Sequence, residues 1–201
     1  MEHGTGSESK EKRPLGRARR RRGRRLCFVL LDGRFMGKRL KVYLETTFVS
    51  WLVARPATLV HSACIQAYTR RWWEEAAPDC DLYVSDLVVQ EAVKGDDEQA
   101  RLRLDVIKTV NVLDSSNAQA RELANRLLEA HAVPASEYPD ALHIATASVY
   151  AMDVLLTWNC RHMANFATLP KTIGVVARAG YECPQIITPK AILEEADNGE
   201  I

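Results

Sequence analysis

The stretch DALHIATASVYAMDVLLTWNCRH, residues 140–162, decides the fold of this chain. It opens on the carboxylate of Asp140, which begins an apolar helix expected over 140–151, and it continues into a short apolar strand expected over 154–157. Polar residues follow the strand at once. In an open α/β sheet, ligands bind just beyond the C-terminal ends of the strands. We therefore expect the carboxylate of Asp140 and the amide of Asn159 to share a site there.

The rest of the chain alternates short β-branched or apolar runs with segments of helical periodicity. This alternation predicts an α/β fold, a three-layer α/β/α sandwich with helices on both faces of a central parallel sheet. We expect strands over 40–44, 82–84, 109–113, 154–157 and 185–188. We expect helices over 46–54, 61–76, 86–93, 97–108, 117–130, 140–151 and 172–179, and one more from Pro189. Thr46 or Thr47 is the expected cap of the first helix.

The basic residues are concentrated at the N-terminus. Residues 1–41 hold 14 Lys and Arg against 4 Asp and Glu, a net charge of +10, whereas residues 42–201 hold 13 against 22, a net charge of −9. The run KEKRPLGRARRRRGRR cannot bury apolar surface, so we expect residues 1–36 to be a disordered basic extension and residues 37–201 to form one domain. The extension either attracts nucleic acid without reading its sequence or precedes the functional protein, since Met36 would be an ordinary start. We favour the second interpretation and assign the extension no function.

Apolar runs and cysteine spacing indicate the cellular compartment. No apolar run reaches the roughly 18 residues that span a bilayer, and no segment has the pattern of a secretory signal. The five cysteines are scattered, without a CxxC pair or a disulfide framework. We therefore expect a cytoplasmic protein in a reducing compartment, with no membrane association.

Two further acids follow apolar runs. Glu45 comes directly after the first predicted strand, and Glu91 lies on the helix after the second. Right-handed βαβ connections deliver such side chains to one edge of the sheet, so we expect both acids to converge on Asp140 and Asn159. Converging acids repel one another unless a cation neutralises them, and oxygen ligands suit Mg²⁺ or Mn²⁺ and not zinc. Because such a cation can activate water and stabilise a phosphoryl oxygen, the pattern favours phosphodiester hydrolysis.

Each of these residues also has an ordinary structural interpretation. Glu45 is compatible with a solvated strand end, and Glu91 with the solvent face of an amphipathic helix. Asp140 is the kind of acid that the helix dipole favours at an N-terminus, and Asn159 is a common helix cap. His143, one turn after Asp140 in an apolar helix, is typical of a hydrogen-bonded core histidine.

Four ordered blocks of the chain resemble the PIN-domain nucleases. The blocks are YLETTFVSWL at 43–52, YVSDLVVQEAVKGD at 83–96, PDALHIATA at 139–147 and LLTWNCRHMAN at 155–165. Within that superfamily they look most like the VapC-like toxins of bacterial type II toxin–antitoxin systems, and GYECPQIITPKAILEE at 180–195 resembles the ending of one branch. The resemblance implies a PIN-like α/β/α sandwich, an acidic cluster that binds Mg²⁺ or Mn²⁺, and endoribonuclease activity.

The resemblance also assigns roles to particular positions. The catalytic and metal-binding positions match Glu45, Glu91, Asp140 and Asn159. Thr157 matches the family's threonine and is expected to order the site, with Thr46 and His143 as further supporting residues. Glu45 stands where the family usually has Asp, and Asn159 supplies a neutral carbonyl where the family often has a fourth acid. Three formal negative charges should weaken or narrow metal binding without abolishing it, since carbonyls are competent Mg²⁺ ligands.

These matches predict a metal-dependent endoribonuclease that acts as the toxin of a type II toxin–antitoxin pair. RNA would be its substrate, a cognate antitoxin protein its partner, and a homodimer its assembly. The alternative is a PIN-like module that binds RNA or protein with weak or no catalysis, which the departures at Glu45 and Asn159 motivate. A phosphohydrolase of small phosphoesters is a third and less favoured class, because no Gly-rich phosphate loop occurs.

Overall fold

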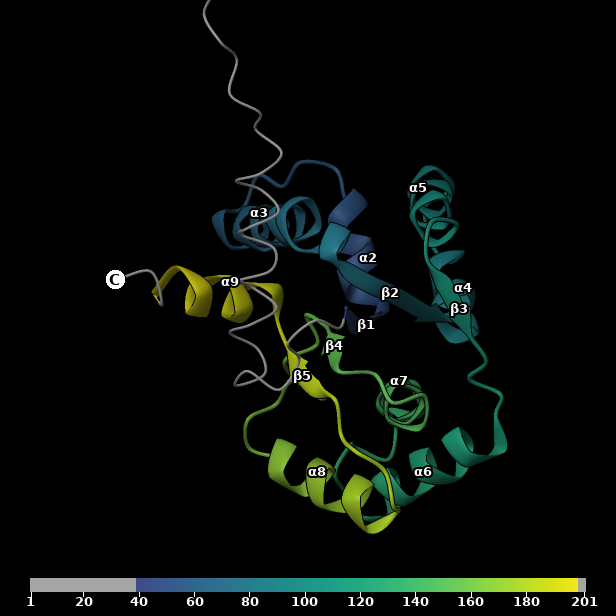
Figure 1. The fold of residues 1–201 in the computed structure, drawn as a ribbon. Helices are drawn as coiled ribbons and strands as arrows, with labels where there is room; N and C mark the ends of the chain where they lie inside the picture. The colour runs from purple at the N-terminus through teal and green to yellow at the C-terminus, as the bar shows by residue number, and fades with distance from the viewer. Residues whose placement is uncertain (1–38, 199–201) are drawn as a thin grey trace, which may run out of the picture.

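A five-stranded parallel sheet forms the centre of the protein (Figure 1). The computed structural model describes residues 39–198, so the predicted extension over 1–36 lies outside the described residues. The strands are β1 (Leu40–Leu44), β2 (Cys80–Ser85), β3 (Asn111–Leu113), β4 (Val154–Leu156) and β5 (Gln185–Ile187). They pair in the order β3-β2-β1-β4-β5, and every pair is parallel.

Helices cover both faces of this sheet. They are α2 (Thr46–Val53), α3 (Val60–Glu75), the 3₁₀ helix η1 (Ala77–Asp79), α4 (Asp86–Ala92), α5 (Asp97–Ile107), α6 (Ala118–Glu129), α7 (Tyr138–Val149), α8 (Leu169–Arg178) and α9 (Pro189–Asn198). The group α2, α3 and α5 lies on one side and the group α6, α7 and α8 on the other, as Figure 1 shows. The predicted three-layer α/β/α sandwich is confirmed. Within the described part of the chain, no helix has the length and apolar character that a bilayer crossing requires.

The two central strands account for much of the core. All three residues of β4 are buried, and in β1 only Lys41 is partly exposed. Strands that are covered on both faces show such near-continuous apolar runs instead of alternation. Phe48 of α2 and Trp72 of α3 pack edge to face, with ring centroids 5.4 Å apart, and so hold the first two helices on the sheet.

The strand order reverses between β1 and β4. The chain leaves β1 for α2 on one face and leaves β4 for α8 on the other face (Figure 1). Leu44 is paired with Leu156, and the amide of Glu45 donates to the carbonyl of Leu156 at 3.1 Å. Glu45 and Thr157 therefore leave the sheet side by side at the switch point, where α/β sheets place their ligand sites.

Several element boundaries differ from the sequence prediction. Strand β2 begins two residues earlier than predicted, because Cys80 pairs with Leu40 at the start of β1. Strand β3 begins two residues later than predicted, because the amide of Val110 donates to the carbonyl of Ile107 and closes the last turn of α5. Helix α7 also begins two residues early, which places Asp140 inside its first turn.

The predicted cap of the first helix is wrong. Glu45, and neither Thr46 nor Thr47, occupies the N-cap position of α2, and its carboxylate accepts a hydrogen bond from the amide of Thr47 at 3.0 Å. A carboxylate is a strong acceptor for the free amides at a helix N-terminus and is favoured there by the helix dipole. Both threonines lie within the helix, and their hydroxyls donate to carboxylates instead.

Candidate metal centre

Glu45 is a buried carboxylate at the point where β1 becomes α2. Its residue is 4% exposed. Its Oε2 accepts hydrogen bonds from the amide and hydroxyl of Thr47 and from the hydroxyl of Thr157, the last at 2.8 Å. Its Oε1 accepts none from any described residue. Burial raises the pKa of Glu45, although the charge of His143 and the threonine hydrogen bonds oppose that rise.

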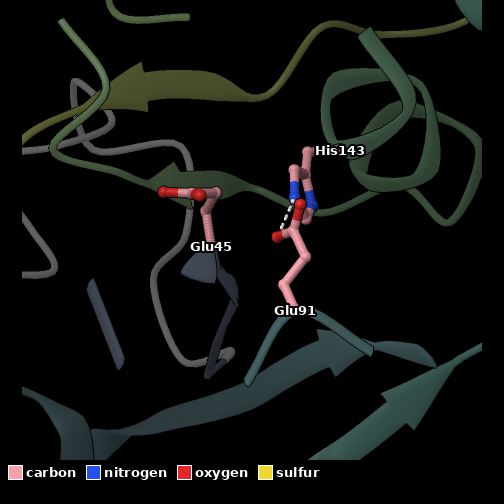
Figure 2. A group of neighbouring side chains, drawn as sticks. All are labelled: Glu45, Glu91 and His143. Carbon is pink, nitrogen blue, oxygen red and sulfur yellow. Dashed lines mark hydrogen bonds and ion pairs between the residues drawn. The ribbon is translucent and has the colours of Figure 1, made fainter. Parts of the chain in front are cut away.

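Glu91 and His143 face each other across the sheet edge, as Figure 2 shows. Oε2 of Glu91 lies 3.1 Å from Nε2 of His143, and the same oxygen accepts a hydrogen bond from the hydroxyl of Thr46. The side chain of Glu91 is thus turned toward the protein and not to bulk solvent. Burial favours a higher pKa for Glu91, but the hydrogen bond and charge of His143 and the Thr46 bond outweigh it and lower the pKa.

His143 lies at the centre of a buried chain of hydrogen bonds. Its residue is 1% exposed. Its Nδ1 lies 2.8 Å from the hydroxyl of Tyr43, which lies 2.7 Å from Oγ of Ser85. Burial raises the pKa of Tyr43 above its usual value, so the phenol stays neutral and serves as a hydrogen-bonding group. The ring of His143 is therefore fixed at both nitrogens, as expected of a core histidine.

Asp140 belongs to a neighbouring group at the start of α7. Its Oδ2 accepts a hydrogen bond from Nδ2 of Asn159 at 2.8 Å and lies 2.9 Å from Nδ1 of His162. Its Oδ1 accepts no hydrogen bond from the residues that the structure describes. Glu137 completes the group, with a carboxylate oxygen 3.8 Å from the same His162 nitrogen.

Asn159 both caps a turn and orients Asp140. Its Oδ1 accepts from the amide of His162 at 3.1 Å, while its Nδ2 donates to Asp140. Its own amide donates to Oγ1 of Thr157 at 2.9 Å, and that hydroxyl in turn donates to Glu45. Asn159 therefore caps a turn and not a helix, and it connects Asp140 to Glu45 through one threonine.

The predicted site residues fall into two adjacent groups. One carboxylate oxygen each of Glu45 and Glu91 and a ring nitrogen of His143 lie within 4.8 Å of one another. The corresponding atoms of Glu137, Asp140 and His162 form a second such group. The three predicted acids do not form one group by this measure, but Asp140 and His143 are a single turn apart on α7.

The sequence prediction omits several residues that shape these groups, among them Tyr43 and His162. Tyr43 stands in the middle of an apolar strand, where its packing gives no hint that its hydroxyl reaches a histidine. His162 follows Asn159 by three positions, the spacing between a cap and the amide that it accepts from. That spacing fixes the backbone of His162 beside Asn159, but it gives no signal for the contact of its ring with Asp140.

The three acids share one feature that bears on metal binding. In each of Glu45, Glu91 and Asp140, one oxygen is held by hydrogen bonds and the other accepts none from described residues. A carboxylate that is fixed by hydrogen bonds holds both of its oxygens in defined positions, which an ordered metal site requires. Oxygen-rich donor sets of this kind fit a hard divalent cation such as Mg²⁺ or Mn²⁺.

Comparison with known proteins adds little to this picture. No protein-family model matches the chain, and no curated protein matches it either. Among solved structures, the chain is similar to a chain in the crystal structure of DNA-bound VapBC from Salmonella typhimurium, with a TM-score of 0.49 and 16% sequence identity. The match covers 75% of this chain and 98% of that chain. The functional assignment therefore rests on the site itself.

Proposed function

We propose that this protein is a divalent-cation-dependent endoribonuclease whose Mg²⁺ or Mn²⁺ is held by Glu45, Glu91 and Asp140, with Asn159 assisting. The observation that carries the proposal is the set of three carboxylates, each with one fixed and one free oxygen, at the carboxyl edge of a parallel sheet. They flank the switch point between β1 and β4, where ligand sites occur in such sheets. The resemblance of the surrounding sequence blocks to PIN-domain nucleases supports RNA as the substrate.

The hydrogen bonds among these residues support one connected centre. Asp140 is tied to Glu45 through Asn159 and Thr157, and it shares helix α7 with His143, which contacts Glu91. Glu45 and Asp140 are therefore linked through two intervening residues, and Glu91 is linked to Asp140 through His143 and helix α7.

In the proposed reaction the protein positions an RNA phosphodiester and a water molecule at this edge. A bound divalent cation would supply a Lewis acid that polarises the phosphoryl oxygen and lowers the pKa of water. Thr157 and Thr47 hold Glu45, Thr46 and His143 hold Glu91, and Asn159 holds Asp140. One of the free carboxylate oxygens accepts the proton of the attacking water as general base. As the water oxygen bonds to phosphorus, the bond from phosphorus to the leaving ribose oxygen breaks, and that oxygen takes up a proton.

Cleavage of RNA tests this proposal. Wild-type protein with Mg²⁺ or Mn²⁺ should cleave RNA, and chelator should abolish the cleavage. Asp140→Asn should lower the rate by about 100-fold or more, because it removes a negative ligand at the centre. Glu122→Gln is the matched control, since Glu122 is an exposed acid on α6 that pairs with Arg126, and it should cleave at the wild-type rate. Equal, chelator-resistant cleavage by wild type and Asp140→Asn would overturn the mechanism.

The toxin interpretation adds two proposals about assembly. A small antitoxin protein would bind near the centre and block it, inserting a basic side chain among the acids. The protein would itself form a homodimer. Light scattering at high protein concentration tests the dimer, and a single monomeric species would contradict it.

A module that binds RNA or protein without cleaving remains the second candidate. The amide of Asn159 favours it, because a neutral donor contacts Asp140 where a fourth acid would stand. Cation binding at millimolar Mg²⁺ or Mn²⁺ without RNA cleavage would support this candidate. Cleavage of a chromogenic phosphomonoester, with none of RNA, would instead support a small-molecule phosphohydrolase.

A further inference from the structure

One of the two groups of ligand atoms contains a nitrogen as well as oxygens. Nε2 of His143 lies 3.1 Å from Oε2 of Glu91, and a Glu45 oxygen lies within 4.8 Å of the ligand atoms of both (Figure 2). Adjacent ligands of an octahedral ion, each about 2.1–2.2 Å from the metal, lie roughly 3.0–3.1 Å apart. The spacing of the nitrogen and the oxygen therefore suits two neighbouring ligands of one ion as well as it suits a hydrogen bond.

The two oxygens of Glu45 differ in their contacts. Glu45 is only 4% exposed, and its Oε1 accepts no hydrogen bond from the described residues. This oxygen is not among the buried polar atoms that lack a partner, so it is open to water or to a cation at the sheet edge. The described residues supply no donor to this oxygen, which leaves it available to a cation.

The hydrogen bonds behind His143 allow its ring to bind a cation. In one arrangement Ser85 donates to Tyr43, Tyr43 donates to Nδ1, and the hydrogen on Nε2 points to Glu91. In the reverse arrangement Nδ1–H donates to Tyr43, Tyr43 donates to Ser85, and the lone pair of Nε2 faces Glu91. Both fit the measured contacts of 2.8 and 2.7 Å, since each hydroxyl can donate or accept. The reverse arrangement carries the same number of protons.

The reverse arrangement is stable only with a cation beside Nε2. A lone pair and a carboxylate oxygen 3.1 Å apart repel each other, and a divalent ion that contacts both turns the repulsion into attraction. Metal-bound histidines generally donate their other N–H to a fixed acceptor, which sets the tautomer and the ring orientation. The buried hydroxyl of Tyr43 is in that position.

We propose that Nε2 of His143 is a direct ligand of the cation, beside Glu45 and Glu91, and that the centre consequently favours Mn²⁺ over Mg²⁺. This inference rests on the proposed function, because it concerns the same site. Imidazole suits transition metals, whereas Mg²⁺ takes oxygen ligands and dehydrates reluctantly. Tyr43 is a positioning residue in this arrangement, and it acts only through the ring of His143.

Pulsed electron paramagnetic resonance of the full chain loaded with Mn²⁺ tests the nitrogen ligand directly. Wild-type protein should show the coupling of a bound nitrogen, and labelling histidine with ¹⁵N should change that coupling. The coupling should persist in His162→Gln, the matched control from the neighbouring group, and vanish in His143→Gln. Mn²⁺ should bind wild type about 10-fold more tightly than Mg²⁺, and that preference should disappear in His143→Gln. Tyr43→Phe should weaken Mn²⁺ binding while keeping the coupling.

If His143→Gln does not fold, wild type labelled with ¹⁵N-histidine and the His162→Gln variant still show whether His143 binds the ion. Bound Mn²⁺ without histidine coupling would overturn the inference and leave the nuclease proposal standing. Coupling that is lost in His162→Gln would also overturn it, because the ion would then lie in the other group. Failure of the wild-type chain to bind Mn²⁺ at millimolar concentration would overturn both the inference and the proposed function.

Discussion

Glu45 and Asn159 each have a definite local role at the sheet edge. Glu45 uses one oxygen to cap α2 and to bind Thr157, and it keeps the other oxygen free. Asn159 donates a hydrogen bond to Asp140. An amide at this position holds the acid without adding a fourth negative charge, which limits repulsion among the carboxylates.

Glu45→Gln should stabilise the protein when no metal is bound. Burial raises the pKa of Glu45 and so favours its neutral form. The stability that the neutral form contributes is complete below the ordinary pKa of glutamate, and it is lost as the pH rises through the raised pKa of Glu45. Glutamine is neutral at every pH and still offers an oxygen to the threonines. In chelator near pH 7 we expect the free energy of unfolding to rise by roughly 1 kcal/mol, which corresponds to an increase of about 2–4 °C in the unfolding midpoint. Near pH 4 we expect the midpoint to stay unchanged.

The same variant should lose the stabilisation that Mn²⁺ gives to wild type. Thermal unfolding with and without the ion measures both effects on one sample. A lower midpoint in chelator near pH 7 would contradict the assignment of Glu45 as a carboxylate that is costly to bury without a cation.

Two buried threonines should respond in opposite ways to replacement by valine. The hydroxyl of Thr157 bonds Glu45 and the amide of Asn159, whereas the hydroxyl of Thr146 has no hydrogen-bond partner. Thr157→Val should lower the free energy of unfolding by about 1–3 kcal/mol and weaken Mn²⁺ binding about 10-fold. Thr146→Val should leave binding unchanged and be neutral or stabilising. Chemical denaturation and ion titration measure both; equal losses in the two variants would contradict the role of Thr157.

At the scale of elements, the alternation of apolar runs and helical periodicity predicts the layers and the parallel sheet correctly. Such patterns reflect burial, which the sequence records directly. The errors concern the ends of elements. Cys80 extends β2 because β1 lies beside it, and Glu45 displaces two threonines as the cap of α2. The pairing of Cys80 with Leu40 has no local signature in the sequence, whereas the cap of α2 is a local contact made by a residue type that is less common as a cap than threonine.

Helix α8 offers a matched pair of glycines. Gly174 lies inside the helix, and a Cβ there would meet only the flexible end of Arg178, at 3.3 Å. Gly180 follows the helix with φ of +87°, a left-handed conformation that glycine adopts without strain. Gly174→Ala should therefore stabilise the protein by up to about 1 kcal/mol, whereas Gly180→Ala should destabilise it by about 1 kcal/mol. Midpoints of thermal unfolding that shift in the same direction would contradict this account of the helix.

At the scale of the whole molecule, the strand order explains how much of the site is predictable. The reversal between β1 and β4 brings Glu45 and Thr157 together, so the edge that carries the site follows from the predicted alternation. The partition of the acids into two groups does not follow from it, because the partition depends on which hydrogen bonds each side chain makes. The contact of Glu91 with His143 joins α4 to α7 across 52 positions of sequence.

The uneven charge of the chain gives a further expectation. The segment before Met36 holds 11 Lys and Arg, and the remainder of the chain has a net negative charge. RNA binding by the full chain should weaken steeply with salt, and a chain that begins at Met36 should show a salt dependence several units smaller in logarithmic slope. Cation-dependent cleavage should persist in the shorter chain, because the acids all lie beyond that point. Filter binding across a salt series measures the slope, and loss of cleavage would contradict the placement of the centre.

A titration with Mn²⁺ in which occupancy and RNA cleavage are followed on the same samples tests the central claim most directly. Free Mn²⁺ is measured by electron paramagnetic resonance, and the initial rate of cleavage is measured at each concentration. We expect half-maximal cleavage at the concentration that half-fills the site, and we expect Glu91→Gln to lose both together while Glu122→Gln keeps both. Full cleavage with the site empty, or a filled site without any cleavage, would contradict the claim that these carboxylates hold the cation for a ribonuclease.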